Sequence, residues 1–428
     1  MENPDETNFT ARLQQRITYG ETLPDGTVVD LVQTAGRDGP SLLSWGRYGM
    51  GIRSAIDCGG ISYRPPTLHR SILDAIRFPS GAAEYGTIRE LFLKVAGACR
   101  QHLRLPEDLA AFATCWILST WIPELVLIPF TLCIFAPFLQ VFSVLRVLGA
   151  LCRRALLVAE LNRNLPLFVE PTLLVNDPSL EEETCDLWRA ANCRGLFVAG
   201  DKSTLRSLRC TKAVILQPDK PLDTWGPESM SLVLPHSDFP PLSDSQLADL
   251  AVEFQPWLEM FRLRLLSGAE PFVSKSHPLA RFELVRHLGP CIPEDGEIVR
   301  LLTPLLELHQ QELTGWGTRD PGVASLKSVW TPLHQQKEMS VDEITTRDNA
   351  ILRSFGEMYE YNTREIGRRL ANLKLVTTSN GQRKVLRFSG ENRLRIHQCV
   401  REFGLQLPFF DDCPDCKRLQ ATEQKPVE

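Results

Sequence analysis

The chain changes its hydrophobic period several times, and these changes outline its folded parts. Between Ile88 and Thr120, apolar residues recur every three to four positions, which predicts helices. Further along, five short apolar runs alternate with stretches long enough for helices, such as 180–193. The runs are residues 126–135, 172–175, 196–199, 213–216 and 231–234. Such alternation is typical of an α/β domain with a mainly parallel sheet, in which ligands bind beyond the carboxyl ends of the strands.

The most apolar stretch, residues 125–151, allows two interpretations. It is long enough for a membrane-spanning helix, and Arg146 is its only charge. However, Pro129 and Pro137 interrupt it, and an interior proline removes a helical hydrogen bond. The part after Pro137 is also amphipathic. These features favour a buried strand at 126–135 followed by a helix at 138–153, and a membrane-inserted segment stays as the alternative.

The turn between that strand and that helix has the position of a phosphate-binding loop. Such a loop reads GxxxxGK[ST], because glycine amides and a lysine surround the phosphate while a hydroxyl holds magnesium. Ala136 and Val141 stand at the two glycine positions, and Phe142 stands at the lysine position. Ser143 alone keeps a matching residue. The sequence therefore predicts a nucleotide site that has lost most of its phosphate-binding groups.

The apolar run at 172–175 shows a similar change. In a nucleotide-hydrolysing protein, two acids follow the corresponding strand, and the first of them positions magnesium. Here the two positions hold Asn176 and Asp177. An amide is neutral, so Asn176 cannot offset the charge of a divalent cation as a carboxylate does.

Residues 78–265 resemble the bacterial and phage P-loop NTPases of the helicase-like or AAA+ type. The resemblance rests on helical sequence at 114–121, the stretch 148–154 after the loop, and the run 171–177 that ends in polar residues. It implies a P-loop NTPase-like core with a mainly parallel sheet. The changes at both motifs imply that the chain has no catalytic residues and that ATP and magnesium are not its cofactors. A nucleotide-dependent ATPase or helicase-related enzyme that works with a partner chain is the alternative.

Residues 341–403 predict a helix, a turn, a second helix and a hairpin. Asn362 is a suitable cap for the second helix, and Asn380-Gly381 between two β-rich runs indicates the hairpin. This order resembles a winged-helix domain, in which the second helix enters the major groove and the hairpin lies against the DNA backbone. The candidate nucleic-acid contacts are Arg364, Arg368 and Arg369, which are expected to point outward from the second helix, and Arg383, Lys384 and Arg387 on the hairpin. Winged helices also bind proteins, so DNA, RNA and protein stay open as targets.

Composition limits where a basic surface can lie. The net charge of −5 and the pI near 6.0 argue against a generally cationic nucleic-acid-binding surface, so any basic surface must be local. The acidic N-terminal residues lack the pattern of a secretory signal, so we expect a cytoplasmic protein. Twelve cysteines are scattered along the chain, several of them in apolar segments, as expected for reduced core residues.

One cysteine pair, Cys413 and Cys416, lies in the C-terminal segment with CxxC spacing. A structural zinc site normally needs four ligands, and the sequence contains no second CxxC. His397, Cys399 or another subunit could supply the missing ligands. We therefore expect no cofactor, and the pair stays as a candidate for zinc.

The patterns together predict five parts. They are a small, partly β region at 1–80, the degenerate P-loop NTPase-like core at 81–235, a helical lid or adaptor at 236–330, the winged helix at 331–408 and a tail at 409–428. Arg262 and Arg264 in the adaptor are expected to be solvated charges, with a sensor role as the alternative. The functional prediction is a non-catalytic nucleic-acid-binding or scaffold protein. Its expected partners are DNA, a related ATPase or further copies of this chain.

Overall fold

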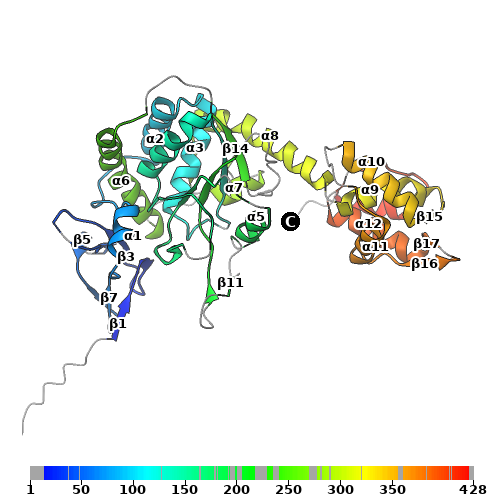
Figure 1. Ribbon diagram of the computed structural model, residues 1–428, viewed down its shortest axis with the longest axis horizontal. Helices are drawn as coiled ribbons and strands as arrows, with labels where there is room; N and C mark the ends of the chain where they lie inside the picture. The colour runs from blue at the N-terminus through cyan, green and yellow to red at the C-terminus, as the bar shows by residue number, and fades with distance from the viewer. Residues whose placement is uncertain are drawn as a thin grey trace, which may run out of the picture. The chain divides into compact units, whose positions relative to one another are not determined.

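The computed structural model describes residues 14–423 of the 428-residue chain, apart from several short segments. The segments left out are residues 37, 48, 127, 163–164, 178–179, 181, 191, 193–197, 200–204, 217–228, 235–240, 269–276, 280–281, 289–290, 320, 355–359, 382, 404 and 406. The chain divides into two compact units, Met1–Gln310 (unit 1) and Gln311–Glu428 (unit 2) (Figure 1). The expected border at 235 lies outside the described residues, and the other borders stay predictions.

A five-stranded parallel sheet forms the centre of unit 1. Its strand order is β14-β8-β13-β10-β9, and every neighbouring pair is parallel. The strands are β8 Thr131–Phe135, β9 Leu156–Val158, β10 Leu173–Val175, β13 Lys212–Ile215 and β14 Ser229–Val233. Because the strands are parallel, the segments that follow β8 and β10 leave the sheet at the same edge. The α/β class with a parallel sheet is therefore confirmed.

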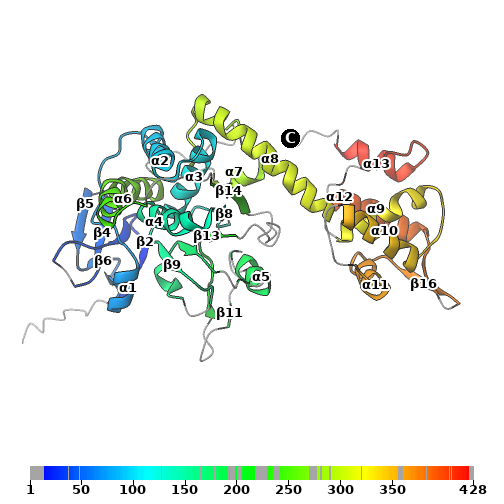
Figure 2. The same ribbon diagram turned by 45° about the horizontal axis from the view of Figure 1, so that its top comes forward.

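The two faces of this sheet pack against different partners, because successive strand residues point to opposite sides. Leu132 and Ile134 belong to a core cluster shared with α2, α3, α4 and α6, whereas Cys133 belongs to a cluster that contains Trp188 of α5. Figure 2 shows the first group of helices together on one side of the sheet. The helices of unit 1 are α1 Arg70–Ala75, α2 Ile88–Leu103, α3 Glu107–Trp121, α4 Val141–Leu151, α5 Glu182–Ala190, α6 Asp244–Leu266 and α7 Glu283–Leu288. Unit 1 also contains two 3-10 turns and the first part of α8 Gly296–Arg319. The turns are η1 Phe138–Gln140 and η2 Leu167–Val169.

The N-terminal region is built of two small sheets, as its turn-rich sequence predicts. The antiparallel sheet β2-β3-β4-β5 is formed by Gly20–Thr22, Val28–Val32, Ser41–Gly46 and Gly49–Arg53. The sheet β1-β7-β6 is formed by Gln14–Ile17, Ile61–Arg64 and Ile56–Cys58. All five residues of β3 are buried, including Asp30 at its centre. A buried acid in an apolar strand requires partners, which the core of unit 1 supplies.

Unit 2 is a helical domain with a three-stranded antiparallel sheet. Its helices are α9 Pro321–His334, α10 Val341–Ser354, α11 Thr363–Asn372, α12 Gly390–Glu402 and α13 Pro414–Glu423. Its strands are β15 Met339–Ser340, β16 Thr377–Asn380 and β17 Arg383–Leu386. They pair in the order β15-β17-β16. Asn380 is opposite Arg383, so two residues connect the strands of the expected hairpin. Gly381 has a positive φ of 64°, a conformation that favours glycine. Asn362 caps α11 and accepts a 3.1 Å hydrogen bond from the Glu365 amide.

The apolar stretch at 125–151 contains β8 and α4, which confirms the strand and helix interpretation, although the strand begins at Thr131. Within the described part of the chain, no helix has the length and apolarity needed to cross a membrane.

Three other elements differ from the sequence predictions. β11 Val198–Ala199 does not join the parallel sheet but pairs with β12 Leu205–Arg206, and residues 196–197 of the expected strand are not described. The edge of the parallel sheet beside β10 is formed by β9, a strand of three residues, which is too short to predict. The two helices expected at 247–254 and 257–266 are the single helix α6, which continues through Pro256. Proline removes one hydrogen bond donor, and the carbonyl left without its partner belongs to the exposed Val252.

Candidate functional sites

The loop between β8 and α4 has the connectivity of a phosphate-binding loop but a different surface. Ala136 follows β8 directly, and the chain then forms η1 before α4 begins at Val141. The side chain of Val141 is buried in the core, and Ser143 is half-buried in the first turn of α4. No residue from 131 to 143 has a positive φ.

Apolar side chains cover the tip of this loop. Phe138 is 90% exposed, Leu139 is 88% exposed and Phe142 is 63% exposed. The side chain at the lysine position is therefore directed to solvent but carries no charge. Placing a phosphate against these side chains would remove water from the anion without supplying a hydrogen bond donor in return.

A cleft of about 510 Å³ opens beside Phe142, between α4 and the first residues of α6. Two arginines line it, and both already have partners. Arg146 forms an ion pair with Asp244, and Arg77 donates a 3.1 Å hydrogen bond to the Leu247 carbonyl. Both guanidiniums therefore have contacts that tie them to α6.

Asn176 and Asp177 lie at the carboxyl end of β10, at the same sheet edge as the loop. The side chain of Asn176 is exposed. Its backbone N–H donates a 2.9 Å hydrogen bond to the Val158 carbonyl. Asp177 is only 7% exposed, and its Oδ2 accepts a 3.1 Å hydrogen bond from the Leu161 amide. The carboxylate therefore stabilises the chain after β9, which is a structural role.

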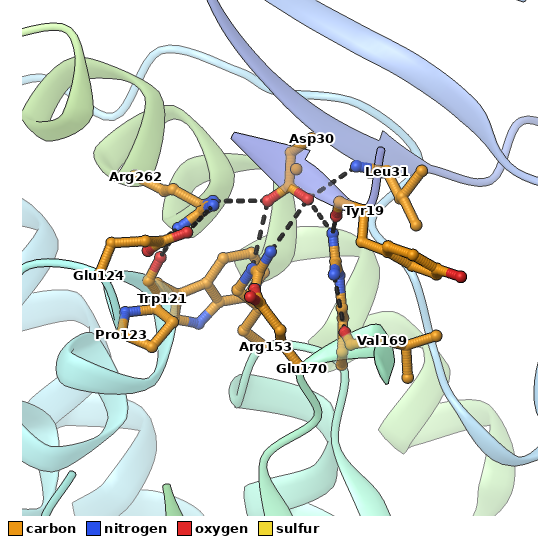
Figure 3. A network of polar contacts seen from close by, with 12 residues as sticks. Tyr19, Asp30, Leu31, Trp121, Pro123, Glu124, Arg153, Val169, Glu170 and Arg262 are labelled. Carbon is orange, nitrogen blue, oxygen red and sulfur yellow. Dashed lines mark hydrogen bonds and ion pairs between the residues drawn. The ribbon is translucent and has the colours of Figure 1, made fainter. Parts of the chain in front are cut away.

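A buried cluster of charged side chains lies beyond the C-terminal end of α4, where Asp30 meets three arginines (Figure 3). Arg153 donates two hydrogen bonds to Asp30, of 3.1 and 3.2 Å, and Arg262 donates one of 2.6 Å. Arg154, which follows Arg153 after the end of α4, also pairs with Asp30. These four residues come from three segments that are far apart in sequence.

A second carboxylate, that of Glu124, balances part of this positive charge. Arg262 contacts both Glu124 oxygens, at 2.6 and 2.7 Å, and donates a 2.8 Å hydrogen bond to the Trp121 carbonyl. Burial disfavours ionisation of Asp30, but the three guanidiniums outweigh this effect and hold the pKa of its carboxyl far below the usual value. The expectation that Arg262 is solvated is therefore wrong, because its guanidinium is the buried link between α6, β3 and the end of α3.

Arg264 is not freely solvated either. It pairs with Glu84 and lies over the ring of Tyr85, with 4.8 Å between its guanidinium carbon and the ring centroid. These contacts of Arg262 and Arg264 join α6 to the rest of unit 1.

In unit 2, the predicted nucleic-acid contacts gather on α11 and the hairpin, but they are not all equivalent. Arg364, Arg368, Arg383 and Lys384 are exposed and form no ion pair with the described residues. Arg387 is exposed and lies 3.4 Å from Glu338. The outward orientation expected for Arg369 is wrong, because its guanidinium carbon lies 3.6 Å from the centroid of the Tyr361 ring.

A group of metal-ligand side chains lies elsewhere in unit 2. His334 of α9 and His397 of α12 meet Cys413 and Cys416, and their donor atoms all lie within 4.8 Å of one another. The pairing of His397 with the CxxC cysteines was an alternative in the sequence, whereas His334 was missed. Cys399 is not part of this group, and its Sγ lies 3.9 Å from the Leu373 carbonyl oxygen.

No protein-family model and no curated protein sequence matches the chain. Among solved structures, it is similar to the A-form apo structure of the NrS-1 C-terminal region, with 7% identity over 84% of this chain and 96% of that chain and a TM-score of 0.36. It is also similar to a full-length MCM homologue from Methanopyrus kandleri, with 16% identity over 67% of this chain and 73% of that chain and a TM-score of 0.33. Scores this low do not establish a relationship.

Proposed function

We propose that the chain is a nucleic-acid-binding protein that contacts duplex DNA through unit 2, and that its α/β core is a scaffold that does not hydrolyse nucleotides. The observation that carries the proposal is the group of exposed basic side chains on α11 and on the hairpin β16–β17. No comparable group is present at the loop after β8, where apolar side chains are exposed instead.

The order of elements in unit 2 supports a winged helix. The chain runs α9, β15, α10, α11, β16 and β17, and β15 pairs with β17, so the hairpin is attached beside the start of α10. In a winged helix, the helix directly before the hairpin enters the major groove. By this assignment α11 is the recognition helix and the hairpin is the wing.

Charge in this region is concentrated and mostly positive. Residues 361–390 contain seven basic side chains and one acidic side chain, whereas the whole chain has a net charge of −5. Arg364 and Arg368 are four positions apart on α11 and therefore lie on the same side of the helix. Arg383 and Lys384 add charge at the start of β17. This arrangement is the local electrostatic footprint that a phosphate backbone requires.

The residues at the core loop argue against nucleotide hydrolysis. Phe142 replaces the lysine, Ala136 and Val141 replace the glycines, and Asp177 already accepts a backbone hydrogen bond. This donor set does not fit a nucleoside triphosphate with magnesium. The core is better explained as a scaffold, in which β8 and α4 are retained because they form much of its interior.

The DNA part of the proposal is tested by fluorescence anisotropy with a labelled duplex. We expect the variant Arg364→Ala, Arg368→Ala, Lys384→Ala to bind roughly 10- to 100-fold more weakly, because each exposed charge pair contributes up to about 1 kcal/mol. The control variant removes the same number of exposed positive charges from unit 1, at Arg47, Arg53 and Arg64. Equal affinities in the two variants would contradict DNA contact through unit 2 and favour a protein partner.

The scaffold part is tested separately by thermal shift with ATP and magnesium. A ligand that binds only the folded state must raise the melting temperature by mass action. We expect no shift for the unmodified protein. A shift that disappears in the variant Ser143→Ala, Asp177→Ala would support the alternative, a nucleotide-dependent enzyme.

A further inference from the structure

Two histidines and two cysteines in unit 2 come from three elements and converge on one point. His334 is the last residue of α9 and His397 lies within α12, whereas Cys413 precedes α13 and Cys416 lies in its first turn. His397, Cys413 and Cys416 are buried, and His334 is half-buried. Residues separated by up to 82 positions therefore present nitrogen and sulfur atoms to a common centre.

Three nitrogen-to-sulfur distances within this group match a tetrahedral metal site. With zinc-to-sulfur bonds near 2.3 Å and zinc-to-nitrogen bonds near 2.05 Å, tetrahedral geometry places nitrogen and sulfur ligands about 3.5 Å apart. The Cys416 sulfur lies 3.2 Å from Nε2 of His334 and 3.5 Å from Nε2 of His397. The Cys413 sulfur lies 3.4 Å from Nε2 of His397.

Hydrogen bonds around the group fix which ring nitrogen faces the centre. Nδ1 of His334 lies 2.8 Å from the Trp330 carbonyl oxygen, and Nδ1 of His397 lies 2.8 Å from the Arg393 carbonyl oxygen. A carbonyl can only accept, so each Nδ1 must carry the hydrogen, and each neutral ring directs the lone pair of Nε2 toward the sulfurs. This backbone contact to the second nitrogen is the usual support of a metal-binding histidine.

The surroundings also favour a thiolate at Cys413. Arg393 donates a 3.2 Å hydrogen bond to the Cys413 sulfur, and the Cys416 amide lies 3.5 Å from the same atom. Asp415 holds Arg393 in place, with 3.0 Å between Oδ2 and Nε. Phe410 stacks on His334 at a centroid distance of 4.1 Å, so an aromatic ring covers one side of the group.

We propose that His334, His397, Cys413 and Cys416 bind one zinc ion in a closed structural site that fastens α13 to α9 and α12. Four protein ligands leave no position for a substrate, and zinc accepts this mixture of imidazole and thiolate ligands. The site holds together the ends of the unit that carries α11 and the hairpin. It does not depend on DNA binding, because none of its ligands belongs to the basic surface.

The first test is the metal content of the full-length protein purified without chelator. We expect one zinc per chain by elemental analysis, and loss of this zinc in the variant Cys413→Ser, Cys416→Ser. Cys399→Ser is the matched control, since this cysteine lies in the same unit outside the group, and it should retain the metal. Retention of zinc by the double variant, or its absence from the unmodified protein after incubation with zinc under reducing conditions, would overturn the proposal.

The second test needs no variant and therefore does not depend on whether a mutant folds. Replacing zinc by cobalt should give the strong visible bands of tetrahedral cobalt together with thiolate-to-cobalt charge-transfer absorption. Weak bands of an octahedral cobalt complex would contradict the four-ligand site. A disulfide between Cys413 and Cys416, found by thiol counting and mass spectrometry in the metal-loaded protein, would contradict it as well.

Discussion

Removing the charge of Asp30 should destabilise unit 1 strongly while changing very little of its shape. Asp30→Asn keeps the size of the side chain but leaves Arg153, Arg154 and Arg262 buried without the carboxylate that all three contact. Breaking a buried ion pair by removing one partner costs about 3–5 kcal/mol. The unfolding entropy of a 310-residue unit is about 650 cal/mol/K at roughly 2.1 cal/mol/K per residue, so the melting temperature should fall by about 5–8 °C.

The control and the pH dependence make this prediction specific. Asp57→Asn removes an exposed carboxylate from β6 in the same N-terminal region and should change the free energy of unfolding by less than about 0.5 kcal/mol. Because the pKa of Asp30 is depressed in the folded state, its contribution is fully present above the unfolded value near 3.8 and is lost as the pH falls below it. The difference between wild type and Asp30→Asn, measured by differential scanning calorimetry at pH 5 and below, should therefore shrink below about pH 4. Equal melting temperatures for Asp30→Asn and Asp57→Asn would refute the reasoning.

Three further substitutions test other contacts. Burial and the nearby Asp30 raise the pKa of Glu259 to about 8. The neutral acid therefore stabilises the folded state fully below the unfolded pKa of about 4.5, and this stabilisation is lost as the pH rises toward 8. Glu259→Gln should therefore gain stability relative to wild type from pH 5 to pH 8 in thermal melts. Asp177→Ala should destabilise unit 1 by roughly 1–3 kcal/mol in urea titrations, because the buried Leu161 amide loses an acceptor. Arg369→Ala should lower the free energy of unfolding of unit 2 by roughly 1 kcal/mol, because the contact with Tyr361 is lost. Arg364→Ala should leave it unchanged in the same thermal melts. Equal effects of the two substitutions would show that the contact with Tyr361 is not stabilising.

The sequence predicted the parallel sheet well because its strands are short apolar runs bounded by polar residues. β8, β10, β13 and β14 each lie at a predicted run, and the turn after β8 lies at the boundary expected between the strand ending at 135 and the helix beginning at 138. β9 could not be predicted, because three apolar residues directly after a helix have no period of their own. The continuation of α6 through Pro256 depends on an exposed carbonyl that a sequence pattern does not reveal.

The contacts that hold the molecule together were harder to predict, because they join distant segments. One signal was present for the network in Figure 3, since Asp30 interrupts the otherwise apolar strand Val28–Val32 and a single acid there requires buried partners. Nothing local identifies Arg262 as one of those partners, because it lies 232 residues away. His334 has no spacing relation to the CxxC pair, so only the packing of α9 against α12 brings it to the group.

The salt dependence of duplex DNA binding tests the central claim most directly. The slope of log K against log salt concentration is about −0.9 for each phosphate contact, so losing three contacts should make it less steep by up to about 2.7. We predict this change for the variant Arg364→Ala, Arg368→Ala, Lys384→Ala and an unchanged slope for the unit 1 control at Arg47, Arg53 and Arg64. A slope in the unit 2 variant equal to that of the unmodified protein would contradict the claim that unit 2 contacts DNA.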